Sequence, residues 1–296
     1  MFKTKKEINP FEIVLFVILS VYSLILIGLF VWAIVASFMK VETFKENPLA
    51  FFKDFEIKNY IDMFSEESGI ALVYKDRTGE TVYGYFSQLI NSLIYAGGGG
   101  IFQTFAVAAV AYCTSRYKGI VSSIINMIVI VTMILPIVGT LPSLLDLMKD
   151  MGVHDTWIGV FMQRFGFCNA YYLIFYAGFS SLSWEYAESA FIDGASHFTV
   201  FVRIMLPLVK TLLVTVFILF FVQYWNDYQT PWMLLPSIPT AARGLYHYLY
   251  DKIDLHRDAV PKQIAAGVVL FVPIFIIFVA FRDKIMGNLT EGGIKG

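Results

Sequence analysis

The sequence predicts an all-α fold, a polytopic membrane protein with six transmembrane helices. Of its 296 residues, 57% are hydrophobic and only 15% are charged, whereas a soluble domain has about 45–50% apolar and about 25% charged residues. Six apolar runs are also long enough to cross about 30 Å of hydrocarbon at about 1.5 Å per residue. Because lipid offers no hydrogen-bond partner to backbone amides, each run is expected to form a helix.

The six predicted helices and their connections form one domain at residues 13–281. The helices occupy, to within a few residues, 13–38, 88–113, 120–142, 158–180, 208–235 and 263–281. Residues 1–12 and 282–296 are the flanking segments. The first run is too long for a signal peptide and no small-residue cleavage pattern follows it, so we expect it to remain as a helix.

Basic residues predict the orientation of the chain. With the N-terminus inside, ten of the 22 Lys and Arg residues lie in the shorter cytoplasmic pieces, and eleven lie in a much longer stretch of outer chain. Under the positive-inside rule, this density places both termini in the cytoplasm. The net charge of −1 gives no general attraction to nucleic acid, so binding through a basic patch is excluded.

A polar interruption at 182–207, between the fourth and fifth predicted helices, carries the most informative pattern. Ser183 is a suitable N-cap for a short helix, in which Ala187, Ala190 and Gly194 form a stripe of small residues. Gly194 can then reverse the chain at little steric cost. A second short helix would lead to Pro207, in the first turn of the fifth membrane helix.

The spacing in this segment resembles the signature loop of binding-protein-dependent ABC importer permeases, which reads Glu-Ala-Ala, three residues, Gly, nine residues, Ile, one residue, Leu-Pro. The matching positions are Glu188, Ser189, Ala190, Gly194, Ile204, Leu206 and Pro207, with Ser189 as the one departure. So many elements at fixed gaps are more specific than a short motif. The resemblance implies that residues 182–207 couple to a groove on a cytoplasmic ATPase subunit, with Glu188 and Asp193 in polar contacts.

Further motifs resemble the carbohydrate-type permeases related to the second permease of the maltose importer. They lie at 91–93, 108–112, 116–119, 135–136, 192–196, 225–228 and 292–296. The resemblance implies the type I ABC importer permease fold in a bacterial-type inner membrane. It also implies three kinds of partner besides lipid: a second permease, two ATPase subunits and an extracytoplasmic solute-binding protein. The C-terminal tail, with Lys295 and Gly296, is implied to reach toward the ATPase interface.

Two ionisable residues, Arg164 and Asp227, fall well inside predicted helices. Charges at membrane depth are costly and usually face a cavity or a partner, so each is a functional hypothesis. Aromatic rings around them suit the apolar faces of a sugar, and amides suit its hydroxyls. The candidate substrate path is therefore Arg164, Asn169, Tyr172, Tyr176, Trp225, Asn226 and Asp227. Packing or interface anchoring remains the alternative for the aromatic members.

Other functions are less well supported by the residues present. An intramembrane enzyme is disfavoured because the chain has no His-Glu-x-x-His pair and no Gly-x-Ser-x-Gly elbow. It also lacks a P-loop, and we expect neither metal nor cofactor in this chain, with ATP bound by a partner subunit. A secondary ion-coupled carrier remains the alternative, with Arg164 and Asp227 as a charge relay. The four glycines at 97–100 permit close helix packing or local unwinding, and packing is the favoured interpretation.

Overall fold

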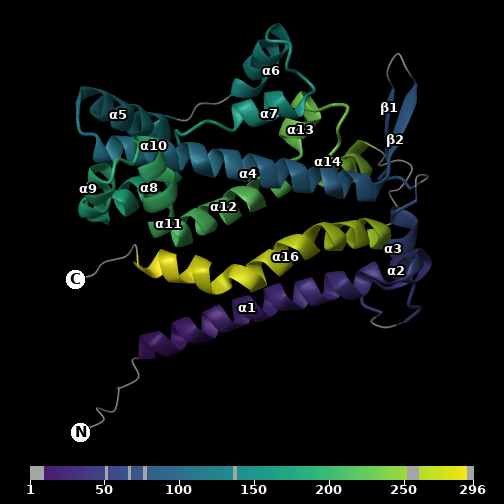
Figure 1. Ribbon diagram of the computed structural model, residues 1–296. Coiled ribbons are helices and arrows are strands. Elements are labelled where there is room, and N and C mark those ends of the chain that lie inside the picture. Colours follow the sequence, from purple (N-terminus) through teal and green to yellow (C-terminus); the bar gives the residue numbers. More distant parts are fainter. Residues whose placement is uncertain are drawn as a thin grey trace.

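The computed structural model describes residues 10–50, 53–65, 68–75, 79–135, 139–251 and 260–291, and these residues are mostly helical (Figure 1). Within these ranges, three helices are long and apolar enough to cross a membrane: α1 (Pro10–Ser37), α4 (Tyr85–Arg116) and α16 (Val260–Glu291). In α16 the candidate span is the part from Val260 to Arg282. A bent pair, His197–Leu208 and Lys210–Trp225, passes the same test jointly and is bent by 84°. The chain is therefore a polytopic helical membrane protein, with three to four candidate spans among the residues that the structure describes.

The long helices run side by side, with α4 at the centre of the larger group (Figure 1). On one side, α1 packs along α16, where the rings of Phe30 and Phe271 lie 4.9 Å apart. On the other, α4 packs against α8 (Ala170–Ser181) and α12 (Lys210–Trp225). The core between these three helices contains buried aromatic side chains: Tyr95, Tyr172, Phe175, Phe179, Phe220, Phe221 and Tyr224.

Two predicted membrane helices are interrupted. The range 158–180 is divided into α7 (Trp157–Gln163) and α8, and 208–235 is divided into α12 and α13 (Gln229–Leu234). Polar side chains at the breaks bond to backbone N–H groups, which offers the chain an alternative to a continuous helix. Asn169 accepts from the N–H of Tyr171 at 3.0 Å, and Asp227 accepts from that of Thr230 at 3.0 Å. Arg164 and Asp227 thus lie at helix breaks rather than within helices.

The third predicted helix also ends early. α5 (Ile120–Ile134) stops at Leu135, whose φ of −82° and ψ of 118° are extended. Leu135 precedes Pro136, and a residue before proline is disfavoured in the helical region. A separate helix, α6 (Thr140–Asp150), then begins inside the range predicted for the third span.

Short elements gather at the end of the bundle opposite to the start of α1 (Figure 1). They include α2 (Val41–Glu46), α3 (Lys58–Met63), α14 (Ala241–Tyr246) and the π-helix η2 (His247–Asp251). An antiparallel hairpin of β1 (Leu72–Lys75) and β2 (Glu80–Tyr83), paired from Leu72 with Tyr83, also lies here, so the fold is not purely α-helical. The segment at 182–207 lies at the other end and contains α9 (Glu185–Ile192), α10 (His197–Val200), η1 (Phe201–Met205) and α11 (Leu206–Leu208).

Candidate functional site

A tight turn at Gly194 separates α9 from α10. Gly194 has a φ of +80°, a conformation that favours glycine. Its N–H donates to the carbonyl of Phe191 at 3.0 Å, and the N–H of Ala195 donates to the carbonyl of Ala190 at 2.9 Å. This pair of bonds is a Schellman motif, which satisfies the last carbonyls of a helix. The chain reversal predicted at Gly194 is present and is fixed by local hydrogen bonds.

After the turn, the segment continues as a second helical stretch that leads to the membrane helix α12. Ser196 caps α10 by accepting from the N–H of Thr199 at 3.3 Å. Helical residues then continue through η1 and α11, and Val209, with φ −105° and ψ 22°, marks the bend before α12. Pro207 lies in α11, before this bend, rather than in the first turn of the membrane helix as predicted.

The segment buries one face and exposes the other. Ala187, Ala190 and Met205 are buried against the bundle. Large apolar side chains flank the turn and are exposed, Ile192 at 86% and Phe198 at 70%. Among the other motif positions, Glu188, Ser189, Asp193, Gly194 and Pro207 are exposed, and Ile204 and Leu206 are half-buried. An exposed apolar tip with acidic neighbours is typical of a surface that binds another protein.

The same segment is fastened to the end of α4. Arg116 donates to the backbone carbonyls of Phe179 and Leu182, to the latter at 2.8 Å, and so satisfies the C-terminus of α8. The Tyr117 hydroxyl and His197 Nδ1 are 2.7 Å apart. A displacement of the tip would therefore be carried into α4 and α8 through these contacts. The pairing of Tyr117 with His197 is not evident from the sequence, because the two residues are 80 positions apart.

A second cluster joins the two helix breaks. Arg164 Nη2 lies 3.3 Å from Asp227 Oδ2, and the Tyr95 hydroxyl donates to the same oxygen at 2.7 Å. Arg164 also donates to the Tyr95 hydroxyl, and its guanidinium carbon lies 3.9 Å from the centre of the Tyr224 ring. Only 8% of the Arg164 side chain is exposed. The two charges predicted to face a cavity or a partner thus face each other.

The glycines of α4 allow this cluster to approach the helix closely. A Cβ added to Gly98 would lie 2.6 Å from the Phe161 ring, and one on Gly99 would lie 3.1 Å from the Tyr224 ring. A Cβ on Gly100 would be 3.1 Å from Phe217, whereas Gly97 has nothing within 4 Å. The packing prediction is therefore confirmed for three of the four glycines. Tyr95, one turn before Gly99, is the member of this cluster that a glycine-lined helix face could have indicated.

The other predicted path residues do not join this cluster. Tyr172 is buried, and its hydroxyl lies 2.6 Å from the Thr114 hydroxyl and 2.6 Å from Asn126 Oδ1. Trp225 is also buried and donates from its indole nitrogen to the Leu270 carbonyl at 2.9 Å. Asn169 caps α8, Tyr176 is half-buried and Asn226 is exposed. The polar groups of the buried members are thus engaged within the protein.

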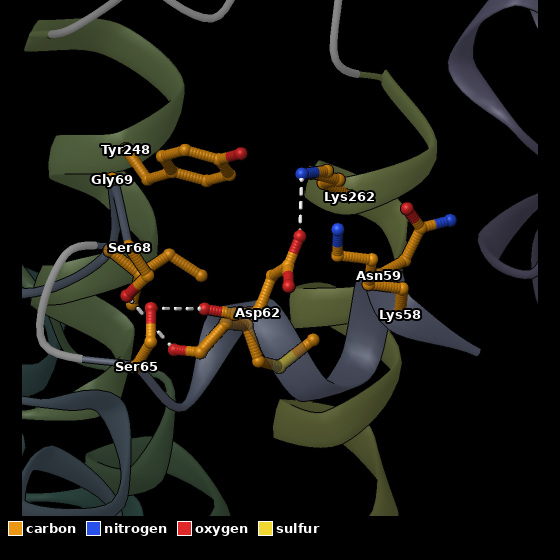
Figure 2. Close-up of a pocket in the computed structure, with 10 residues that line it drawn as sticks. Lys58, Asn59, Asp62, Ser65, Ser68, Gly69, Tyr248 and Lys262 are labelled. Atoms are coloured by element: carbon orange, nitrogen blue, oxygen red, sulfur yellow. Dashed lines mark hydrogen bonds and ion pairs between the residues drawn. The ribbon is translucent and has the colours of Figure 1, made fainter. Parts of the chain in front are cut away.

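A hollow of about 360 Å³ lies at the opposite end of the molecule, between α3, η2 and α16 (Figure 2). Figure 2 shows Asp62 and Lys262 pointing toward one another, with 3.0 Å between Oδ2 and Nζ. Tyr248 lies on the other side, and burial raises the pKa of its hydroxyl. Within the part of the chain that the structure describes, no group of three or more His, Cys, Asp or Glu residues could hold a metal ion.

Comparisons with known proteins place this arrangement in a family. The model of the family "binding-protein-dependent transport system inner membrane component" matches residues 86–288. The chain is 22% identical over 282 residues to the diacetylchitobiose uptake system permease protein NgcG of Streptomyces coelicolor, covering 94% of this chain and 87% of that protein. It is 26% identical over 221 residues to the trehalose transport system permease protein SugB of Mycobacterium tuberculosis, covering 72% and 78%.

The fold is similar to that of a chain in the crystal structure of a bacterial ABC transporter involved in the import of the acidic polysaccharide alginate. The TM-score is 0.73 at 18% identity, covering 96% of this chain and 99% of the other. This likeness supports the permease fold, and the family match spans the Gly194 turn, the Arg164–Asp227 pair and most of α16. The chain therefore belongs to the binding-protein-dependent transport system inner membrane components, the non-catalytic, multi-pass transmembrane subunits of ABC transporters that work with ATPase and binding-protein components.

Proposed function

We propose that this chain is the permease subunit of an ABC importer for a sugar or oligosaccharide, driven through residues 182–207. The observation that carries the proposal is the coupling tip, residues 188–198, which turns at Gly194, exposes Ile192 and Phe198 and is bonded to the end of α4. The relatives NgcG and SugB are named for the transport of diacetylchitobiose and trehalose, which supports a saccharide as the substrate.

Six crossings of the membrane are part of this proposal. Four of these crossings are α1, α4, α12 and α16. The apolar helix α5 and the pair α7 and α8 supply the other two crossings, all within the domain 13–281. The start of α1 lies at the same end of the molecule as α9, and this supports a cytoplasmic N-terminus, 1–12, beside a cytoplasmic coupling tip (Figure 1). The tail 282–296 would lie on the same side. Lys295 and Gly296 lie outside the described residues, and their contact with the ATPase remains a prediction.

The partners in the proposal are a second permease, two ATPase copies and an extracytoplasmic solute-binding protein. Glu188 and Asp193 are exposed on the tip and would make polar contacts with the ATPase. Ile192 and Phe198 would add apolar contacts. Closure of the ATPase pair would then displace the tip as a rigid body and carry α4 and α8 with it.

We assign two roles within the predicted substrate path. Asn226 and Tyr176 retain exposed surface and are candidates for direct sugar contact, alongside the cap residue Asn169. Arg164 and Asp227 would form the wall of the path rather than bind sugar, because each satisfies the charge of the other. Their pairing also disfavours the ion-coupled carrier, because each charge is already neutralised by the other within the protein.

Gly194→Val tests the coupling role. A β-branched residue is strained at a φ of +80°, so the turn should change while the membrane helices remain. In proteoliposomes containing the whole complex, we expect normal insertion, residual ATP hydrolysis and loss of substrate uptake. The matched control is Gly28→Val on α1, where a Cβ has nothing within 4 Å. Uptake by the Gly194 variant equal to that of the control would contradict the assignment.

A further inference from the structure

Four aromatic side chains form a cluster on α13, α14 and η2, at the end of the molecule opposite to the coupling tip. Tyr246 lies at the centre, with ring centroids 4.2 Å from Tyr228, 4.8 Å from Tyr250 and 5.9 Å from Trp232. The Tyr228 and Tyr246 rings are stacked, with 8° between their planes. We refer to these four residues as the aromatic platform.

The aromatic platform is exposed although its rings are large and apolar. Tyr250 is 61% exposed, Trp232 is 49% exposed and Tyr228 is 37% exposed. Single exposed aromatic residues need no explanation, but a contiguous group of them marks a binding surface. The platform does not belong to the buried core around α4, and neither the coupling tip nor the Arg164–Asp227 cluster includes any of its members.

The helices that carry the platform are held in place by polar contacts. Arg243 Nη1 donates to the carbonyls of Leu235 at 3.1 Å and Pro236 at 2.9 Å. Asp155 fixes the same connection, because it accepts from the N–H of Ser237 at 3.0 Å and donates its own N–H to Leu234 at 3.0 Å. The platform is therefore preorganised before any ligand arrives, which lowers the entropy cost of binding.

A hollow of about 390 Å³ lies beside the platform. Its wall is formed by Trp232 and Tyr246 from the platform, by Arg243 and His247, and by residues 71–73 at the start of β1. The volume falls within the roughly 300–1,000 Å³ typical of small-molecule sites. Guanidinium and imidazole N–H groups next to aromatic faces are the combination that a polyhydroxylated ring needs, because its hydroxyls accept hydrogen bonds and its C–H face packs on an aromatic ring.

The two other readings of this region fit it less well. An aromatic belt at the lipid interface would present its rings to lipid headgroups, whereas Trp232 and Tyr246 line a hollow that Arg243, His247 and residues 71–73 of the same chain enclose. The hollow in Figure 2 is a weaker candidate for a sugar. The one aromatic residue that lines it, Tyr248, is only 4% exposed and so offers no open ring face on which a sugar could stack.

We propose that the aromatic platform and its hollow form a saccharide-binding site on the permease itself, which stacks pyranose rings on Trp232 and Tyr250 and binds their hydroxyls through Arg243 and His247. This inference rests on the proposed function, because it takes the transported sugar as the occupant. The site would receive the sugar from the solute-binding protein before the path between the helices opens.

The test compares Trp232→Ala and Tyr250→Ala with Phe86→Ala, which removes a 64% exposed ring at the start of α4, outside the platform. The complete transporter in nanodiscs is titrated with trehalose, diacetylchitobiose and a uronate trisaccharide, and binding is followed by saturation-transfer NMR. Uptake KM is measured in proteoliposomes. Because each platform variant loses one aromatic contact, we expect it to weaken saccharide binding and to raise the uptake KM about tenfold. Maximal ATP hydrolysis should not change. Phe86→Ala should change neither the binding nor the KM.

The outcomes separate the two proposals. Saccharide import with a KM that is the same in the platform variants and in Phe86→Ala would overturn the platform and leave the proposed function intact. Platform-dependent saccharide binding without any import would support the platform and count against the proposed function. Quenching of Trp232 fluorescence by brominated lipid, measured against Trp232→Phe and unrelieved by saccharide, would identify a lipid-facing belt and overturn the inference.

Discussion

The coupling tip and the Arg164–Asp227 cluster are built in opposite ways. The tip is held by bonds between near neighbours in the chain, such as that from Ala195 to Ala190, and it exposes its distinctive side chains. The cluster joins residues 63 to 132 positions apart, and its Arg side chain is only 8% exposed. We therefore expect substitutions at the tip to impair coupling without unfolding the protein. Substitutions in the cluster should instead destabilise the fold without acting on coupling directly.

Removal of one charge from the cluster should produce the largest effect. Arg164→Met leaves Asp227 largely buried without its cation, and breaking a buried ion pair costs about 3–5 kcal/mol. We expect a clear drop in the midpoint of thermal unfolding in detergent. The double variant Arg164→Met with Asp227→Leu should recover much of this loss, because no unpaired charge remains. A double variant that is as unstable as the sum of the two single variants would show that the pair does not act as a unit.

Two neighbouring glycines of α4 should respond to alanine substitution with opposite changes in stability. Gly98→Ala places a Cβ 2.6 Å from the Phe161 ring, and overpacking of this kind costs about 1–3 kcal/mol. Gly97→Ala meets no atom within 4 Å and should gain up to about 1 kcal/mol, because alanine is the better helix former. Thermal unfolding of the two variants checks the difference. If both stabilised the protein, the close packing of α4 on α7 would be called into question.

The contrast also explains what the sequence could predict. Gly194 was readable because a single positive φ and a few local bonds define the turn, and all of its residues fall in one short motif. The break at Leu135 was readable in principle from Pro136. The glycine run marks the helix face of Tyr95 as closely packed, but the bonds of Tyr95 to Arg164 and Asp227 could not be predicted, because these two residues lie 69 and 132 positions further along the chain. Arg164 and Asp227 were identified as unusual, but periodicity alone could not show that they pair.

Apolar substitutions on the coupling tip test the other half of the comparison. Ile192→Ser and Phe198→Ser remove side chains that are 86% and 70% exposed, so the free energy of unfolding should change by less than about 0.5 kcal/mol. We expect each variant to bind the ATPase about tenfold more weakly, as measured by co-purification at a series of ATPase concentrations. Val121→Ser, which removes an exposed apolar side chain of α5, is the control. A similar loss of ATPase binding in the control would mean that the effect is not specific to the tip.

The smallest effect should come from the surface pair that joins α3 to α16. Asp62 and Lys262 are 3.0 Å apart but remain 35% and 37% exposed, and pairs of this kind contribute at most about 1 kcal/mol. Asp62→Asn should therefore lower the unfolding midpoint slightly at low ionic strength and not at all in about 1 M salt, where the Debye length is about 3 Å. Arg164→Met, measured in the same buffers, should show no such salt dependence, because its partner is shielded from solvent ions. If the lower unfolding midpoint of Asp62→Asn persisted in high salt, the carboxylate would act through packing in the hollow of Figure 2 rather than through its charge. The division between buried and exposed polar contacts would then have to be redrawn there.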